Sequence, residues 1–332
     1  MGGLRRGFGW AARNLAIWSR PSFCVPLLRD LQQLPDALRG GAVAIGNFDG
    51  VHAGHRQIVA RLLARAKEVA GASVVLTFDP HPAELLRPER RPPSLTWLER
   101  KDQLLEALGV DWVIAYPTDR ALLELSAREF YDRIIRGQLD ALALVEGPNF
   151  FFGKNREGDV ERLARWARED GLTLEVVSPV ERGDGLVSSS RIRDELRRGN
   201  VASASSMLCT PYRIRGQVAH GAGRGGTIGF PTANLSDVDT LIPGFGVYAG
   251  RGYVGERSAA AAIHIGPNPT FDDLAPKVEV HLLDWSEDLY DRVLEVEFFD
   301  RIRGVETFAS PEALIAQLGR DVSTARRLVE SR

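Results

Sequence analysis

Two histidines in one short motif are the residues of this sequence best suited to chemistry. Residues 46–55 read GNFDGVHAGH, which places His52 and His55 three residues apart. The apolar run from Ala42 to Ile45 predicts a buried strand, and the apolar spacing after the motif predicts a helix. Free N–H groups at a helix N-terminus and two imidazole donors can together bind a polyphosphate. The pattern is typical of nucleotidyl-transferring α/β enzymes, in which the imidazoles stabilise charge as pyrophosphate leaves.

Two other interpretations of the histidine pair are disfavoured. Surface histidines near a helix cap would be a coincidence in a chain that has six histidines in all. A zinc site would need further ligands at suitable spacing, which the sequence lacks. Gly54, between the two histidines, would let the backbone approach the phosphates without a side chain in the way.

Three further segments follow predicted strands, so they are expected at the same end of the sheet. TFDPHP contains Asp79, GPNFFFGKNREGD contains Asn149, and VSSSRIR contains Ser188, Ser189 and Arg191. Hydroxyls, backbone N–H groups and a guanidinium at a helix start predict a second phosphate-binding group opposite the histidines. For the serines alone, ordinary helix capping is an equal alternative.

GPNFFFGK is not a P-loop, because five residues separate Gly147 from Gly153 and Asn155 follows Lys154. Its three phenylalanines are predicted to form core or an apolar face for an aromatic ligand. HGAGRGG matches the dinucleotide fingerprint at Gly221, Gly223 and Gly226, but Pro231 stands where a helix should run. A flexible flap over phosphates is the better interpretation.

Two segments of the second half carry oxygen ligands. In PTAN, Thr232 and Asn234 could hold a magnesium ion together with nucleotide phosphates, although such a segment alone is more often a turn. In KVEVHLLDW, alternation puts Glu279 and His281 on the face opposite Val278 and Val280. A carboxylate at a barrel mouth could accept a proton from an attacking hydroxyl, whereas a solvated glutamate on an edge strand is the alternative.

The elements that must position these residues change in kind along the chain. Apolar runs alternate with amphipathic segments from residue 42 to about 199, which predicts a doubly wound parallel sheet with helices on both faces. From Tyr212 onward, alternating runs joined by glycine-rich turns predict an antiparallel β-barrel. Ser310 and Pro311 introduce a final helix. A domain boundary is expected near residues 200 to 210.

Composition bounds the class of protein. The 332 residues suit two domains, and 44% hydrophobic with 26% charged residues is typical of globular proteins. The net charge of −2 gives no case for nucleic acid as a partner, and no apolar stretch is long enough to cross a membrane. Two distant cysteines fit a reducing cytoplasm. Residues 1–24 are interpreted as an extension, disordered or translated from too early a start, rather than as an export signal or membrane-binding arm.

Taken together, the motifs closely resemble the bacterial bifunctional riboflavin kinase and FAD synthetase family from about Val25 to Arg332. The segments that carry the resemblance are GNFDGVHAGH, TFDPHP, GPNFFFGK, VSSSRIR, GRGGTIGFPTAN, IPGFGVYA, IGPNPTF, VEVHLLDW and SPEALIAQLGRD. The resemblance implies an FMN adenylyltransferase domain of the HxGH type over residues 25–205. It also implies a six-stranded riboflavin kinase barrel with a C-terminal helix over residues 206–332. The implied reactions are phosphorylation of riboflavin to FMN by ATP, then adenylylation of FMN to FAD with release of pyrophosphate.

The resemblance also implies roles for individual residues. In the adenylyltransferase, His52 and His55 would be catalytic, and ATP would contact Gly46, Asn47, Phe48, Asp49, Gly50, His52, His55, Ser188, Ser189 and Arg191. Asp79 and Asn149 would lie near the flavin and nucleotide. In the kinase, ATP would contact Gly223, Thr227, Gly229, Pro231, Thr232 and Asn234. Thr232 and Asn234 would hold Mg²⁺, Glu279 would be the catalytic base beside the flavin, and Arg303 would contact the flavin.

Several positions depart from the family's pattern. His264 stands where asparagine is usual, Cys209 and Thr210 stand where glycine and arginine are common, and Gly304 follows Arg303 in place of an acidic residue or proline. One alternative to the bifunctional enzyme is a chain that retains a single activity, in which the other half serves as a scaffold or flavin-binding module. A second alternative is a different nucleotidyltransferase fused to a barrel that binds single-stranded nucleic acid, which the net charge disfavours. Small-molecule substrates and a monomer or weak homo-oligomer are expected.

Overall fold

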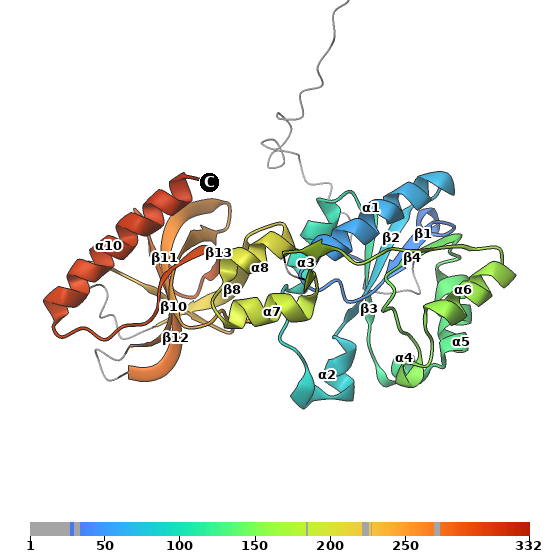
Figure 1. The fold of residues 1–332 in the computed structure, drawn as a ribbon, viewed down its shortest axis with the longest axis horizontal. Helices are drawn as coiled ribbons and strands as arrows, with labels where there is room; N and C mark the ends of the chain where they lie inside the picture. The colour runs from blue at the N-terminus through green and yellow to red at the C-terminus, as the bar shows by residue number, and fades with distance from the viewer. Residues whose placement is uncertain (1–26, 30–33, 184, 221–225, 227, 269–272) are drawn as a thin grey trace, which may run out of the picture.

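Two parts follow one another along the chain in the computed structural model, an α/β part and a β-barrel part (Figure 1). The structure describes residues 27–29, 34–183, 185–220, 226, 228–268 and 273–332. The interpretation of residues 1–24 therefore lies outside the described residues. In the part of the chain that is described, no helix combines the length and apolar character needed to cross a bilayer.

A five-stranded parallel sheet forms the centre of the first part, as the alternating pattern predicts. Its strands are β1 (Ala42–Ile45), β2 (Ser73–Asp79), β3 (Trp112–Pro117), β4 (Ala143–Glu146) and β5 (Thr173–Val176). The order is β3-β2-β1-β4-β5, and each neighbouring pair is parallel. The strand order reverses between β1 and β4, and ligands of such sheets bind beyond the carboxyl ends of the strands at this switch point. The motif that follows β1 begins there.

Helices cover both faces of this sheet. The helices of this part of the chain are α1 (Ala53–Glu68), α2 (Pro82–Leu86), α3 (Leu98–Glu106), α4 (Arg120–Glu124), α5 (Ala127–Phe130), α6 (Val160–Glu169), α7 (Ser189–Arg197) and α8 (Val201–Leu208), of which α7 and α8 pack with the barrel rather than on the sheet. Short 3₁₀ turns span Asp36–Leu38, Pro88–Arg90 and Lys154–Arg156, and a π-helical segment, Tyr131–Gln138, continues α5. Successive side chains of a strand point to opposite faces. Accordingly Val43 packs with Ile134, whereas Ala44 packs with Leu62 of α1 and Leu105 of α3.

The second part is a closed barrel of six strands in the order β10-β11-β12-β9-β8-β13. Their bounds are β8 (Tyr212–Ala219), β9 (Ala233–Ser236), β10 (Gly246–Val254), β11 (Arg257–Asn268), β12 (Asp273–Leu282) and β13 (Val293–Arg303). The long helix α10 (Pro311–Glu330) begins at Ser310, whose side chain accepts a hydrogen bond from the Ala313 N–H. Its Ala325 packs on Ala249 and Ala262, so α10 covers part of the outer face of the barrel. The barrel and its final helix confirm the sequence prediction.

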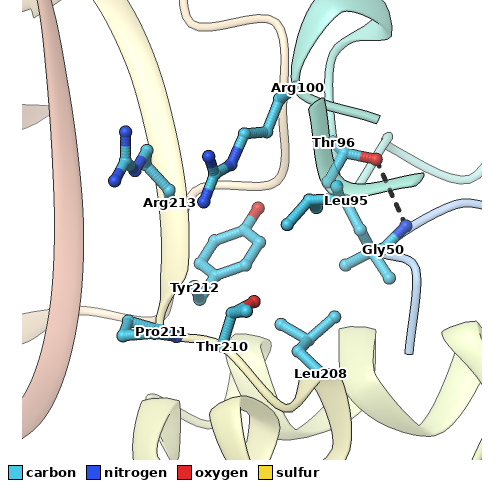
Figure 2. A pocket seen from close by; sticks show the side chains of 10 residues that line it. Gly50, Leu95, Thr96, Arg100, Leu208, Thr210, Pro211, Tyr212 and Arg213 are labelled. Carbon is cyan, nitrogen blue, oxygen red and sulfur yellow. Dashed lines mark hydrogen bonds between the residues drawn. The ribbon is translucent and has the colours of Figure 1, made fainter. Parts of the chain in front are cut away.

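The two parts share a packed junction. One buried cluster contains Leu95 and Leu196 of the first part together with Ile214 and Phe298 of the barrel. Figure 2 shows a small pocket in this junction, where Arg100 of α3 extends toward β8. A short hairpin of β6 (Glu181–Arg182) and β7 (Gly185–Leu186) lies before α7. The expected division between residues 205 and 206 falls inside α8 and stays a prediction.

Candidate active sites

The histidine motif forms the turn from β1 into α1. His52 is the N-cap of α1, and its Nδ1 accepts a hydrogen bond of 3.4 Å from the His55 N–H. Because Nδ1 of His52 is an acceptor, the proton of the neutral ring lies on Nε2, which is then available as a donor. The predicted helix start at the motif is confirmed.

The two imidazoles are stacked, with ring centroids 3.7 Å apart and planes 14° from parallel. Burial lowers the pKa of His52 to about 4, although the carboxylate of Asp49 opposes this shift. Burial lowers the pKa of His55 well below its ordinary value, and the neighbouring His52 and Lys101 add to the effect. Both rings are therefore neutral at pH 7, so they can donate hydrogen bonds to phosphates but bring no charge.

Two buried polar atoms of the motif have no hydrogen-bond partner within the described part of the chain, namely Oδ1 of Asn47 and Nδ1 of His55. Buried polar atoms are nearly always paired, because an unpaired one costs about 1–3 kcal/mol. The two unpaired atoms lie beside the switch point of the sheet, so a ligand bound at this turn could supply their missing hydrogen bonds.

The backbone of the turn is strained at residues other than glycine. Phe48 has a φ of 46° and Val51 a φ of 41°, in the left-handed region that β-branched side chains rarely adopt. Such strain persists where the surroundings over-determine it and is common at functional sites. At Gly54 a side chain would begin 3.2 Å from Cε1 of His52. That glycine therefore makes room for the imidazole, in addition to the phosphate approach predicted from the sequence.

Asp49 ties this turn to two other segments. Its carboxylate accepts hydrogen bonds from the N–H groups of Leu95, at 2.9 Å, and Thr96, at 3.2 Å. It also forms a buried ion pair with Arg193 of α7. Through these contacts the carboxylate holds the turn in place. The expected contact of Asp49 with ATP stays a prediction. The sequence reasoning missed Arg193, although it belongs to the VSSSRIR segment.

The start of α7 lies beside the motif, as expected, but its side chains divide their roles. Ser188 is the N-cap and accepts from the Arg191 N–H at 3.2 Å, and the Ser189 hydroxyl donates to the Asp49 carbonyl at 3.0 Å. The Arg191 guanidinium donates to the carbonyls of Arg182 and Gly185 in the β6–β7 hairpin. In this structure Ser188 caps, Ser189 joins α7 to the turn, and Arg191 holds the hairpin. Their contacts with phosphate stay predictions.

The segments after β2 and β4 are more open. Asp79, at the end of β2, lies 3.6 Å from the Arg29 guanidinium, and Asn149 is exposed. The three phenylalanines do not form one wall. Phe152 is buried and stacks on Phe150 with centroids 5.3 Å apart, whereas Phe151 is 43% exposed beneath the Arg156 guanidinium. The core interpretation holds for Phe152, and Phe151 remains accessible.

Two buried ionisable groups near the motif were missed from the sequence. Lys101 of α3 is 8% exposed, and its Nζ donates to Thr77 Oγ1 at 3.1 Å. Glu146, the last residue of β4, accepts a 2.8 Å hydrogen bond from the Ile45 N–H, and burial raises its pKa well above the ordinary range. The one sequence signal for Glu146 is a carboxylate that ends an apolar strand. Lys101 has none, because it reads as a polar residue of an amphipathic helix.

In the barrel, Glu279 lies between two polar residues of neighbouring strands. It pairs in register with His264 of β11 on one side and with Asn234 of β9 on the other. His264 Nδ1 is 3.5 Å from Glu279 Oε2, and the glutamate side chain is 19% exposed. Val278 and Val280 belong to the barrel core, so Glu279 lies on the outer face. It is neither inside the barrel nor freely solvated.

The segment before β9 is attached to the same face. Nδ1 of His281 lies 2.7 Å from the Pro231 carbonyl oxygen, and the His281 ring packs edge-on against the Phe230 ring. Thr232 is partly buried, and Gly229 is exposed with a φ of 85°. Gly223 and Thr227, expected to contact ATP, lie outside the described residues, as does most of the expected flap. The structure thus places Thr232, Asn234 and Glu279 on adjoining strands and segments.

Arg303, expected near the flavin, binds the C-terminal helix. Its guanidinium forms an ion pair of 2.8 Å with Asp321 of α10 and lies 5.5 Å from the Phe308 ring centroid. It therefore holds α10 against the end of β13, and its contact with flavin stays a prediction.

The donors near β9 suit a magnesium ion. Mg²⁺ prefers oxygen ligands and usually keeps water and substrate phosphates as most of its shell. The Thr232 hydroxyl and the Asn234 amide oxygen are such donors, and the Glu279 carboxylate lies on the adjacent strand. In the described residues no group of three or more His, Cys, Asp or Glu could hold a metal.

Comparison with known proteins divides the chain into two matched regions. Residues 34–191 match the FAD synthetase family, and residues 208–329 match the riboflavin kinase family. The bifunctional riboflavin kinase/FMN adenylyltransferase of Pseudomonas fluorescens is 40% identical over 304 residues, covering 91% of this chain and 97% of the relative. The protein of the same description from Escherichia coli (strain K12) is 37% identical over 302 residues, covering 90% and 96%.

A solved structure shares the arrangement of both parts. A crystal structure described as a macrolide-efflux protein from Streptococcus pneumoniae has a TM-score of 0.79 and 29% identity, covering 91% of this chain and 98% of that one. The similarity therefore extends over the α/β part and the barrel together.

Proposed function

The chain belongs to the bifunctional riboflavin kinase/FMN adenylyltransferase family, and from this premise we propose how its two sites act. The barrel phosphorylates riboflavin to FMN with ATP. The α/β part then transfers AMP from a second ATP to FMN, which gives FAD and pyrophosphate.

The pair of neutral, stacked imidazoles at the start of α1 carries the proposal for adenylyl transfer. A phosphate oxygen of FMN attacks the α-phosphorus of ATP, and the bond from that phosphorus to the bridging oxygen of pyrophosphate breaks. His52 and His55 donate hydrogen bonds to the phosphoryl oxygens as charge builds, a role that preorganised donors perform well. Ser188, Ser189 and Arg191 are proposed to contact the nucleotide from α7, and Asp79 and Asn149 from the flavin side.

The placement of Glu279 beside Asn234 supports the proposal for the kinase. The carboxylate accepts the proton of the riboflavin 5′-hydroxyl while that oxygen attacks the γ-phosphorus and ADP leaves. Thr232 and Asn234 would hold Mg²⁺, which, when bound, neutralises charge on the ATP phosphates. Catalysis by this chain is then mostly positioning of the hydroxyl against the phosphate.

Two turnover assays of the full chain test the function. With riboflavin, ATP and Mg²⁺ we expect FMN followed by FAD, and with FMN, ATP and Mg²⁺ we expect FAD directly. EDTA should stop the first reaction. FMN that accumulates in the first assay, with no FAD formed in either assay, would leave a kinase with an inactive α/β part. Retention of RNA on a filter without flavin turnover would favour the nucleic-acid alternative.

We further propose that the chain acts in the cytoplasm on small molecules, without nucleic acid or membrane partners, as a monomer or weak homo-oligomer. Light scattering during size-exclusion chromatography measures the mass directly, and a stable larger particle would contradict this assembly state.

A further inference from the structure

Lys101 is an unusual residue for its place in this chain. The sequence has four lysines among its 42 basic residues, namely Lys67, Lys101, Lys154 and Lys277. Lysine is rarely buried because its ammonium loses hydration, and this chain uses arginine for most of its ion pairs. Lys101 is nevertheless 8% exposed. A buried compact cation therefore needs a reason.

The surroundings of Lys101 are the groups of the adenylyltransferase site. Nζ donates to Thr77 Oγ1 at 3.1 Å, and that hydroxyl donates to the Asn47 carbonyl at 3.1 Å. The charge of Lys101 acts on His55, and the carboxylates of Asp49 and Asp79 act on Lys101. The ammonium thus lies between the motif after β1 and the carboxyl end of β2.

The ammonium is only partly used by the protein. It has three N–H donors, and in the described part of the chain Thr77 is its one hydrogen-bond partner. No carboxylate oxygen of the described residues lies within 4.0 Å of Nζ. Burial lowers the pKa of Lys101, and Asp49 and Asp79 oppose that shift. Two donors therefore remain for a ligand.

The histidine motif itself supplies no positive charge to the phosphates. His52 and His55 are neutral at pH 7, and Arg193 is paired with Asp49. The reaction brings a phosphate of FMN against the triphosphate of ATP, which concentrates negative charge at the attacked phosphorus. A buried cation there would be worth more than one in water, because the surrounding dielectric is low.

We propose that Lys101 contacts the substrates directly, with its ammonium binding a phosphate oxygen of the reacting FMN and ATP pair. The inference rests on the proposed adenylyl transfer and adds a residue to it. Thr77 holds the lysine side chain, and the ammonium supplies the positive charge that the two imidazoles do not.

Lys101→Met tests this, since methionine keeps the length of the side chain and removes its charge. We expect adenylyltransferase kcat/KM to fall by about 100-fold or more, in the range found when a preorganised electrostatic donor is removed. Riboflavin kinase activity of the same preparation should stay within about twofold. Lys67→Met, at an exposed position of α1, is the matched control and should change neither activity. Calorimetric titration with ATP and with FMN shows which substrate's phosphate loses affinity, and loss for either supports the proposal.

A purely structural lysine would behave differently. Thr77→Val removes the hydroxyl that holds Nζ but leaves the ammonium, so its loss should be at least tenfold smaller than that of Lys101→Met. Equal losses, or full adenylyltransferase activity in Lys101→Met, would overturn the proposal while wild-type FAD synthesis still stood. If Lys101→Met lost both activities through misfolding, Lys101→Gln, which keeps a donor for Thr77, would be judged by the same criteria.

Discussion

Glu279 and Asn234 lie directly opposite each other on the antiparallel strands β12 and β9. His264 of β11 pairs with Glu279 from the other side, so three polar residues cross the outer face of the barrel in one row. A shift of any one of these strands by one residue would turn its polar residue toward the core. The pairing of strands therefore places the proposed base beside the proposed magnesium ligand.

Glu279→Gln should abolish FMN formation from riboflavin, because the amide cannot accept the proton of the attacking hydroxyl. A fall of about 100-fold or more in kinase kcat is expected, in the range typical of general-base catalysis. FAD formation from added FMN should be unchanged and serves as the control for folding. Loss of both reactions in a folded variant would contradict two separate sites.

His264 should position Glu279. Its Nδ1 lies 3.5 Å from the carboxylate, so His264→Ala removes the imidazole next to it on β11. We expect kinase kcat to fall about tenfold. His264→Asn should keep most of the activity, because its amide can donate to Glu279 from a position similar to that of Nδ1. Steady-state kinetics with riboflavin measure both. Equal activity of the alanine and wild-type proteins would mean that the carboxylate is held by other contacts.

His55→Ala should abolish FAD formation and leave FMN formation intact. The variant removes one of two stacked donors, and the loss of a single preorganised donor costs about 100- to 1,000-fold in kcat. The measurement is FAD produced from FMN and ATP, with FMN produced from riboflavin as the internal control. A fall of less than tenfold would place the phosphates away from the imidazoles.

Stability should depend on pH through His52. Its pKa is about 4 in the folded protein, below the ordinary 6.5, so the unfolded chain binds the proton first. The free energy of unfolding should therefore fall as the pH drops from 6.5 toward 4, by up to about 1.4 kcal/mol per pH unit from this residue. Urea unfolding over that range should show a shallower dependence in His52→Gln. The same pH dependence of the free energy of unfolding in the variant and the wild type would mean that His52 is not a buried, neutral imidazole in the folded protein.

The buried pair of Asp49 and Arg193 should couple strongly in stability. Asp49→Ala leaves the Arg193 guanidinium buried without its carboxylate, a change that costs about 3–5 kcal/mol. The double variant Asp49→Asn with Arg193→Met should recover part of this loss, since no unpaired charge remains. Chemical unfolding of Asp49→Asn, Arg193→Met and their double variant gives the coupling energy. Additive losses would show that the two groups do not depend on each other.

Much of the fold could be read from local patterns. The apolar run at Ala42 to Ile45, the motif after it and the helical spacing beyond predict β1, the turn and α1 together. The same reasoning places the barrel after Tyr212 and the last helix after Ser310. These predictions succeed because periodicity and capping depend on residues close together in the chain.

Which side chains contact one another at the sites depended on the tertiary structure. Arg191 and Arg193 are two residues apart on α7, so they point in different directions, and only packing decides that Arg193 meets Asp49 while Arg191 binds the hairpin. Lys101 reaches the motif only because β2 lies beside β1 in the sheet.

The sequence alone determined which groups end strands and begin helices, since that depends on neighbours along the chain. The tertiary structure decided which distant groups share a site, because strand order and register join segments whose local patterns carry no record of each other.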